Sequence, residues 1–391
     1  MKTNVSSYYD LIEFGLGNSS FQTFLDQFAA NKYNKLQTEG FDWDPNIQLS
    51  DTYEQLIAES NITTLPIYTD INSEALDKSL GTFKVGSNRI PTQKHRYGLD
   101  TRILRERMLL YQQFGESTLN SAARNVMFDL LFESTDKLLG GNRNALTHQR
   151  MQIVSNGQFT IGADNNPRGI QGITFDFGIE DKTTLEGDAR WWTSSTHTAA
   201  NQGSASDPIK DLKDKVKSKK QAGCPAMHIE MSLDLFDDLL THTAVLQRIG
   251  YALFPSAGSD AAAKAAAGNL SDDALKATLE RLVGAKIQVK DSLSAVDEYD
   301  STSKGIKAHQ IQNFNVLNVA FVPDGKIGTI KSMKPLVFDD PTQRFGWFDG
   351  GRTLIRQRFD SKDNCMYVES EMSVLLVPNM PQYHSIITVT A

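Results

Sequence analysis

The chain has 391 residues, which is longer than a domain built on a single hydrophobic core usually is. Its 40% apolar content is enough for two globular cores with extensions. A formal charge of -7 argues against a dedicated nucleic-acid-binding protein, because such proteins carry a basic surface. Cys224 and Cys365 lie far apart, which excludes a disulfide framework and fits a reducing cytosol. Neither a signal peptide nor an apolar window of about 18 residues is present, so neither export nor a membrane span is expected.

Residues 1–62 are predicted to hold short helical pieces separated by polar turns. Apolar residues occur at helical spacing in two stripes, which are Phe21, Phe24, Leu25 and Phe28, and then Tyr53, Leu56 and Ile57. Two interpretations remain open for this segment. It is either a peripheral helical subdomain that packs on its own chain or an arm that lies across a neighbouring subunit.

Residues 65–114 have the pattern of strands, and Gly86-Ser87-Asn88 is expected to form the tip of a long, polar β-hairpin. The hairpin carries a basic cluster made of Lys84, Arg89, Lys94, His95 and Arg96. Little apolar material stands opposite this cluster, and a two-stranded hairpin is only marginally stable in water by itself. We therefore expect it to need a partner surface on its own chain or another; a solvated loop is the alternative.

Residues 116–162 are predicted to form the central rod of the molecule. Apolar residues recur at helical spacing from 116 to 141, and the pair Gly140-Gly141 is expected to end this helix because glycine favours the left-handed conformation of helix stops. Its length would be roughly 35 Å at the helical rise. A second helical run is expected to end at Asn156-Gly157 and pass into a strand over 158–162.

The second half of the chain predicts an α/β layer. Two short strands are expected over 169–192, and a polar stretch then connects to a helix that begins at Asp207-Pro208. Ser232 is predicted to cap another helix, and strands and helices alternate as far as residue 290. Residues 291–305 lose all periodicity and are predicted to be an exposed loop. Strands are expected again over 314–333 and 366–376, the last one closed by Pro378.

Sequence patterns of catalytic and metal sites are absent. The chain has no phosphate-binding loop, dinucleotide fingerprint, GxSxG elbow, HExxH pair or zinc-spaced Cys/His set. Its 7 histidines are scattered singly, and the adjacent carboxylates Asp237-Asp238 and Asp339-Asp340 are predicted to be solvated charges. The lysines from Lys213 to Lys220 predict a solvated helix face, with nucleic-acid contact as the alternative. No catalytic residue, cofactor or metal ion is therefore expected, although a site could still be assembled from distant positions.

Several segments together resemble a known family. They are TFKVGSNRIPTQKHR, QRMQIVSNGQFTI, FDFGIEDKTTLEGDARWW with the following DPIKDL, MHIEMSLDLFDDLL, VAFVPDGKIGT and VLLVPNMP. Their order, from about residue 65 to 380, resembles that in the major capsid proteins of tailed bacteriophages with the Hong Kong 97-type fold. The resemblance is narrower to the major capsid protein E family of lambda-like phages.

The resemblance implies an α+β fold of the Hong Kong 97 type, built from five parts. These are an N-terminal arm (1–62), an extended E-loop hairpin (63–115), a peripheral domain with a long spine helix (116–206), an axial α/β domain (207–345) and a C-terminal return to the peripheral domain (346–391). The first 60 residues are only loosely similar, and the alanine-rich stretch near Ala261 resembles a local insertion. No large extra N-terminal region is seen, which implies a separate scaffolding protein.

The resemblance also implies a function. The chain would be a non-enzymatic major capsid protein that self-assembles into the pentamers and hexamers of an icosahedral phage head around double-stranded DNA. The implied partners are other copies of the chain, a scaffolding protein, a portal and packaged DNA, which the shell would contact nonspecifically. A decoration protein is a further partner that the resemblance allows, and no membrane is involved. Assembly would take place in the host bacterial cytoplasm. Lys84, Arg89, Lys94, His95 and Arg96 of the E-loop would contact neighbouring subunits. Two alternatives are an encapsulin-like nanocompartment shell and a soluble α/β enzyme or ligand-binding protein.

Overall fold

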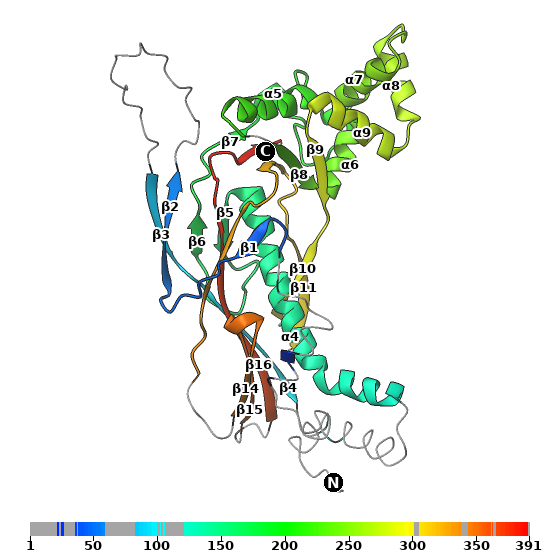
Figure 1. The fold of residues 1–391 in the computed structure, drawn as a ribbon. Helices are drawn as coiled ribbons and strands as arrows, with labels where there is room; N and C mark the ends of the chain where they lie inside the picture. Colours follow the sequence, from blue (N-terminus) through cyan, green and yellow to red (C-terminus); the bar gives the residue numbers. More distant parts are fainter. Residues whose placement is uncertain are drawn as a thin grey trace, which may run out of the picture. The chain divides into compact units, whose positions relative to one another are not determined.

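The computed structural model divides the chain into two compact units, which we describe separately (Figure 1). It describes residues 22, 25–26, 36, 38–58, 83–99, 102, 105, 121–224, 226–300, 305–337, 343–360, 362 and 365–389. The first unit comprises Met1–Tyr53, Asn88–Leu146 and Thr329–Leu376, and the second comprises Glu54–Ser87, Thr147–Gly328 and Val377–Ala391. Phe21, Phe24 and Phe28 of the expected N-terminal stripe lie outside the described residues.

The first unit is built on a six-stranded sheet. Its strands follow the order β1 (Phe41–Trp43), β13 (Gly328–Met333), β16 (Cys365–Pro378), β15 (Thr353–Asp360) and β14 (Gln343–Phe348), and β4 (Thr92–Leu99) also pairs with β16. The strand predicted to close at Pro378 is confirmed as β16. Its Val368, Met372 and Val374 are fully buried, so β16 forms the core of the sheet.

A single helix, α4 (Ser121–Asn156), takes the place of the two helical runs expected from the sequence. Its 36 residues would span about 54 Å at the helical rise. The predicted stop at Gly140-Gly141 is wrong because the helix continues through both glycines. The predicted end is confirmed: Gly157 follows Asn156 with a φ of 71°, a conformation that glycine adopts without the strain of a side chain.

The second unit is built on a five-stranded mixed sheet with helices. The strand order is β7 (Lys182–Thr184), β17 (Ser385–Thr388), β12 (Asn318–Pro323), β8 (Met227–Ser232) and β9 (Lys286–Lys290). Strand β12 runs antiparallel to both neighbours, whereas β17 and β7, and β8 and β9, are parallel pairs. The helices are α5 (Pro208–Gln221), α6 (Leu233–Thr241), α7 (Thr243–Leu253), α8 (Asp260–Gly268) and α9 (Asp272–Val283). The predicted α/β layer is thus present.

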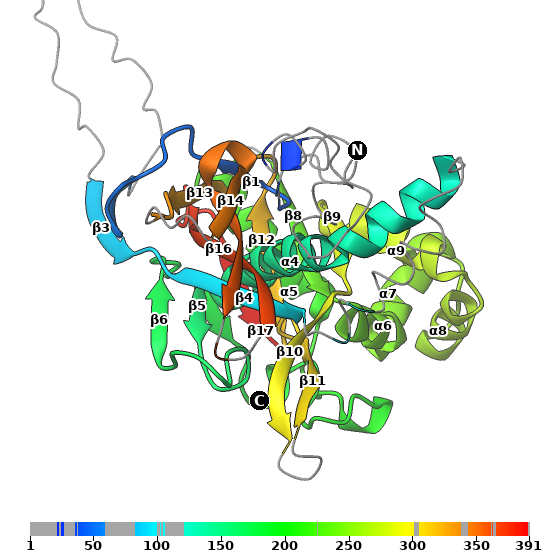
Figure 2. The ribbon, with the colours of Figure 1, turned by 90° about the horizontal axis from the view of Figure 1, so that it is seen from below.

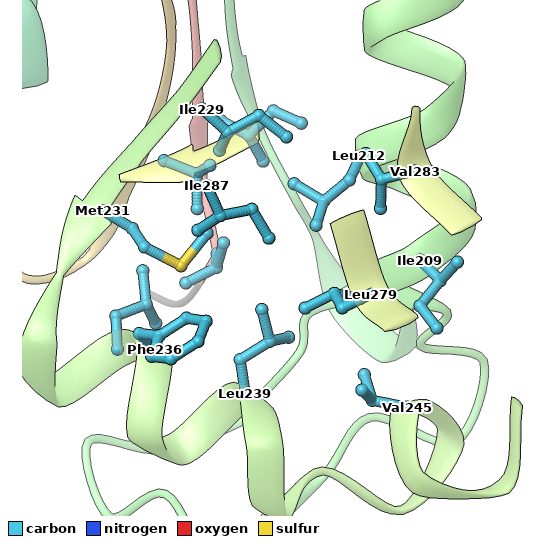
Figure 3. Packing of buried hydrophobic residues seen from close by; sticks show 14 of the residues in the cluster. Ile209, Leu212, Ile229, Met231, Phe236, Leu239, Val245, Leu279, Val283 and Ile287 are labelled. Carbon is cyan, nitrogen blue, oxygen red and sulfur yellow. The ribbon is translucent and has the colours of Figure 1, made fainter. Parts of the chain in front are cut away.

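The core of the second unit lies between this sheet and its helices (Figure 3). Ile229 and Met231 of β8 and Ile287 of β9 face Leu212 of α5 and Leu279 of α9. Burying each such side chain stabilises the fold by about 1.5–3 kcal/mol. The predicted caps also form: the side chain of Asp207 accepts a hydrogen bond from the amide of Lys210, and that of Ser232 from the amide of Leu235. Among the described residues no helix is long and apolar enough to cross a membrane.

Three antiparallel two-stranded sheets complete the described structure, and two of them correct the sequence analysis. Strands were expected at both β5 (Gln158–Ile161) and β6 (Ile173–Asp176), and the structure pairs them. The pair β10 (Leu293–Asp300) and β11 (Gly305–Gln312) replaces most of the exposed loop predicted for 291–305. Both faces of this ribbon hold mixed residues, so the sequence shows no alternation there.

The third pair, β2 (Thr52–Ala58) and β3 (Phe83–Arg89), corrects the predicted hairpin. Gly86-Ser87-Asn88 lies inside β3, so the tip is not at these residues, and 59–82 lie outside the described part of the chain. Residues 53–57, predicted as part of a helix, belong to strand β2. Strand β4 pairs with β16 and not with β3. The pairing with β16 is antiparallel and joins eight residues of each strand in register.

Candidate assembly interface

One face of the first unit's sheet collects charged residues from three strands. In the β4–β16–β15 register, Glu369 stands between Arg96 and Arg356, and Glu371 stands opposite Lys94. Tyr367 stands opposite Arg358, two positions along, and therefore on the same face. We call this surface the basic face and define it by Lys94, Arg96, Arg356, Arg358, Glu369 and Glu371.

Glu369 is the centre of the basic face. Its carboxylate accepts a hydrogen bond from Arg356 Nε at 2.7 Å and another from an Arg358 guanidinium nitrogen at 3.3 Å. Arg96 approaches the same carboxylate at 3.9 Å, and its guanidinium also lies 4.1 Å from the centre of the Tyr367 ring. The planar guanidinium groups thus surround a single buried carboxylate.

The second carboxylate of the face is paired with one cation, since Lys94 Nζ lies 3.0 Å from Glu371 Oε2. Among the six residues that define the basic face, four cationic side chains therefore share two carboxylates, which is an excess of two positive charges within this set. The Lys94 and Arg96 side chains stay 59% and 51% exposed. Exposed pairs of this kind contribute only about 0–1 kcal/mol to folding, so the face is ordered but still open to a partner.

The basic residues expected at a subunit contact occupy three different places. Lys94 and Arg96 lie on the basic face. His95 points to the opposite side of β4, where it packs against Gly141 of α4. Arg89 ends β3, where its side chain is 82% exposed and lies 3.8 Å from Asp51. Lys84 belongs to β3, and only its backbone is described.

The environment of His95 is buried and not basic. Burial lowers the pKa of His95, and hydrogen bonds with Asn142 and with the backbone of Leu138 oppose that shift only in part. His95 is therefore neutral near pH 7 and does not add charge to the hairpin. That these five residues contact neighbouring subunits remains a prediction.

Sequence reasoning missed Arg356 and Arg358. Both lie in β15, in the segment LIRQRF, where the two arginines alternate with Gln357. Alternation places both arginines on the same side of a strand, and this signal could have been read from the sequence. Their place across β16 from β4 could not be predicted from the sequence, because it depends on the pairing of both β4 and β15 with β16.

A second charged cluster lies in the core of the second unit. Arg150 donates two hydrogen bonds to the carboxylate of Glu230, at 2.7 and 2.5 Å, and both residues are at most 1% exposed. His228 bonds Glu230 through Nε2 at 3.0 Å and Asp324 through Nδ1 at 2.6 Å. The cluster ties the end of α4 to strand β8.

The ionisation of this cluster follows from its contacts. Burial would raise the pKa of Glu230, but the hydrogen bond from His228 and the charge of Arg150 outweigh it and lower that pKa to about 2. Burial would lower the pKa of His228, yet its bonds to Glu230 and Asp324 raise it instead. Lys290 Nζ also lies 3.5 Å from Glu230 Oε1, so the buried carboxylate is compensated by several cationic groups, as a structural network requires.

The described residues do not meet the requirements of a metal site. No group of three or more His, Cys, Asp and Glu side chains among them could hold a metal ion. Cys224 and Cys365 are both buried, and neither forms a disulfide. His197, one of the singly scattered histidines, and Asp238, predicted to be a solvated charge, are paired at 2.6 Å, and the His197 ring stacks on Trp192. Asp339 and Asp340 lie outside the described residues.

Comparisons with known proteins give one family. The family model described as phage major capsid protein E matches residues 85–329. No curated protein matches the chain.

Solved structures with similar chains include a phage-related protein from Bordetella bronchiseptica, at 13% identity and a TM-score of 0.46, with 94% of this chain and 96% of that chain covered. The mature capsid of bacteriophage PhiM1 is similar at 11% identity and a TM-score of 0.41, with 89% and 85% covered. A virus-like particle from Pyrococcus furiosus is similar at 8% identity and a TM-score of 0.38, with 94% and 100% covered.

Proposed function

Because the chain belongs to the phage major capsid protein E family, we propose that its copies assemble into the pentamers and hexamers of an icosahedral head that encloses double-stranded DNA. The family match over residues 85–329 carries this proposal, since it covers more than half of the chain. Contacts between unlike surfaces of identical subunits close into rings, which is how one chain can form both capsomers.

The basic face and the β2–β3 hairpin are the proposed contact surfaces. Lys94 and Arg96 are more than half exposed although each lies near a carboxylate, and Arg89 at the end of β3 is 82% exposed. Exposed cations beside a sheet favour the capture of acidic groups on a neighbouring subunit. Lys84 and His95 complete the proposed contact set, His95 by fixing β4 on α4 and not through a charge.

The partners of the shell are proposed on the same premise. A separate scaffolding protein and a portal would direct closure, a decoration protein could bind the outside, and assembly would take place in the host bacterial cytoplasm. Packaged DNA would touch the shell through nonspecific phosphate contacts. The protein performs no catalysis in this proposal and needs no cofactor.

Electron microscopy of the full chain, expressed alone and with its genomic neighbours, tests the proposal. Closed icosahedral particles or rings of five and six subunits are expected. A uniform monomer under every condition would overturn the proposal. Closed shells that enclose a protein cargo and no DNA would instead identify a nanocompartment.

A charge-reversed variant tests the proposed contact residues. Arg89→Glu with Arg96→Glu should leave a folded subunit that no longer assembles, because both side chains are exposed and their loss changes few internal contacts. The control is Lys213→Glu with Lys217→Glu on the exposed side of α5, which makes the same change in net charge. Normal shells from the first variant would refute the contact role.

A further inference from the structure

The β10–β11 ribbon is held firmly at its base by α4. The backbone amide of Asn313 donates to the carbonyl of Ser292 at 3.2 Å, which closes the ribbon where its strands enter the body of the unit. His148 Nδ1 lies 2.9 Å from Asn313 Oδ1, and Gln152 donates to the Asn313 carbonyl at 3.0 Å. The ribbon therefore leaves the unit in a fixed direction, with β10 and β11 side by side (Figures 1 and 2).

The register of the ribbon assigns each side chain to one of two faces. Leu293 pairs with Gln312, Ala295 with Gln310, Asp297 with Ala308, and Tyr299 with Ile306. Because side chains alternate along a strand, these eight residues share one face, which we call the ribbon face. The other face carries Ser294, Val296 and Glu298 opposite Ile311, His309 and Lys307.

The ribbon face carries three large apolar side chains that the described part of the chain leaves exposed. Leu293 is 52% exposed, and Tyr299 and Ile306 are each 60% exposed. The remaining members of this face are also exposed, whereas Ser294, Val296 and Ile311 of the other face are partly buried. Soluble proteins seldom leave adjoining large apolar side chains in water on a two-stranded ribbon, which has no core of its own. This arrangement indicates that another molecule covers the ribbon face.

The charges of the ribbon face and of the basic face are opposite, which indicates that the covering molecule is another copy of this chain. Asp297 is the one charged residue on the ribbon face, and its cross-strand neighbour Ala308 cannot neutralise it. The basic face of the first unit has the opposite character, with an excess of two positive charges. Phe345 adjoins Arg356 in the register and is 37% exposed, so the basic face also offers an apolar contact.

We propose that the ribbon face of one subunit docks on the basic face of a neighbouring copy of this chain. The inference rests on the proposed shell function and names the surfaces that meet in it. Tyr299, Ile306 and Leu293 bury their apolar area next to Phe345, while Asp297 takes up part of the positive excess. The two surfaces differ, so the contact is heterologous and can repeat around a ring.

Substitutions on the two faces of the ribbon separate docking from folding. Tyr299→Ser with Ile306→Ser removes most of the exposed apolar area and is expected to lower the yield of assembled particles at least tenfold. The matched control is His309→Ser, an exposed position on the other face of the same ribbon, which should assemble as the unaltered chain does. Circular dichroism and the Tm of the unassembled subunits should be unchanged in both variants.

Cross-linking identifies the surface that is covered. A benzophenone amino acid at position 299, in subunits mixed from isotope-labelled and unlabelled protein, should give mixed-label cross-links to peptides containing residues 92–98, 343–348, 353–360 or 365–373. Cross-links within one copy, to other segments of a neighbouring copy, or to a co-expressed scaffolding or decoration protein would each overturn the proposal.

The outcome also distinguishes this proposal from the shell function. If the unaltered chain never assembles, the proposed function fails and the docking proposal fails with it. If the unaltered chain forms particles and Tyr299→Ser with Ile306→Ser forms them equally well, only the docking proposal fails.

Discussion

Gly141 is a residue whose role is visible only in the fold. A Cβ atom at this position would lie 2.6 Å from Cε1 of His95, which is closer than real side chains approach. The glycine therefore lets β4 lie against α4, and it does not end the helix. The sequence shows the same Gly140-Gly141 pair that ends other helices, so its function could not be read from the sequence.

Gly141→Ala should destabilise the unassembled subunit. His95 would have to move and lose its place against Asn142, at a cost of about 1–3 kcal/mol that exceeds the higher helix propensity of alanine. Thermal unfolding checks the change, with Gly268→Ala in α8 as the control, because a Cβ there meets nothing within 4 Å. Adding His95→Ala should recover part of the loss, and no change in Tm for Gly141→Ala would contradict the packing argument.

Glu230 holds the charged cluster at the end of α4 together. Glu230→Gln should destabilise the subunit by about 3–5 kcal/mol, because it leaves Arg150 buried without a full counter-charge. Urea unfolding measures this loss, and Glu186→Gln, an exposed carboxylate on the same unit, should change the free energy of unfolding by less than about 0.5 kcal/mol. Equal effects from both variants would show that the cluster contributes little.

The carboxylate of Glu230 also makes the free energy of unfolding depend on pH in the acidic range. The pKa of Glu230 is about 2 in the folded protein and 4.5 for an unperturbed glutamate, so its contribution is complete above pH 4.5 and is lost as pH falls toward 2. In the Glu230→Gln variant this part of the acid dependence should be absent, and free energies of unfolding measured across that range would reveal it.

At the scale of elements, the β10–β11 ribbon is separable from the sheet beside it. The hydrogen bond between Asn313 and Ser292 brings the ends of the ribbon together, so residues 293–312 can be replaced by an Asn-Gly turn. The shortened chain should keep its helix and sheet content by circular dichroism and should no longer assemble. Loss of the folded state would show that the ribbon supports the core, and normal assembly would contradict its docking role.

At the scale of the whole molecule, the predicted fold and family are confirmed. The family match is joined by a long helix, an α/β part and a returning strand in the expected order. The chain therefore belongs to the phage major capsid protein E family, and it has mixed helix and strand content. Its membership also explains why exposed apolar and cationic surfaces are tolerated: subunits of a shell cover one another.

Ionic strength should reveal the charge contribution to assembly. At about 0.1 M salt the Debye length is about 10 Å, and at about 1 M it is about 3 Å, so charge attraction between subunits is screened at the higher value. Asp297→Asn should assemble more slowly than the unaltered chain at low salt, and the two rates should converge at high salt. Light scattering measures both rates, and identical rates at low salt would show that Asp297 takes no part in the contact.

The sequence alone determined the features that depend on neighbouring residues. The caps at Asp207 and Ser232, the end of α4 at Gly157 and the closing strand at Pro378 follow from local conformational preferences, which few residues specify. The order of the resembling segments along the sequence likewise predicted the family, and with it the fold.

Only the tertiary structure decided which strands pair and which face each side chain takes. Arg96 and Arg356 meet at Glu369 because β4 and β15 flank β16, and these strands are far apart in the sequence. The ribbon face depends on register and not on distance along the chain, since Tyr299 and Ile306 become neighbours only when the consecutive strands β10 and β11 pair as they do. Strand pairing depends on contacts between distant segments, and no local pattern of residues specifies such contacts.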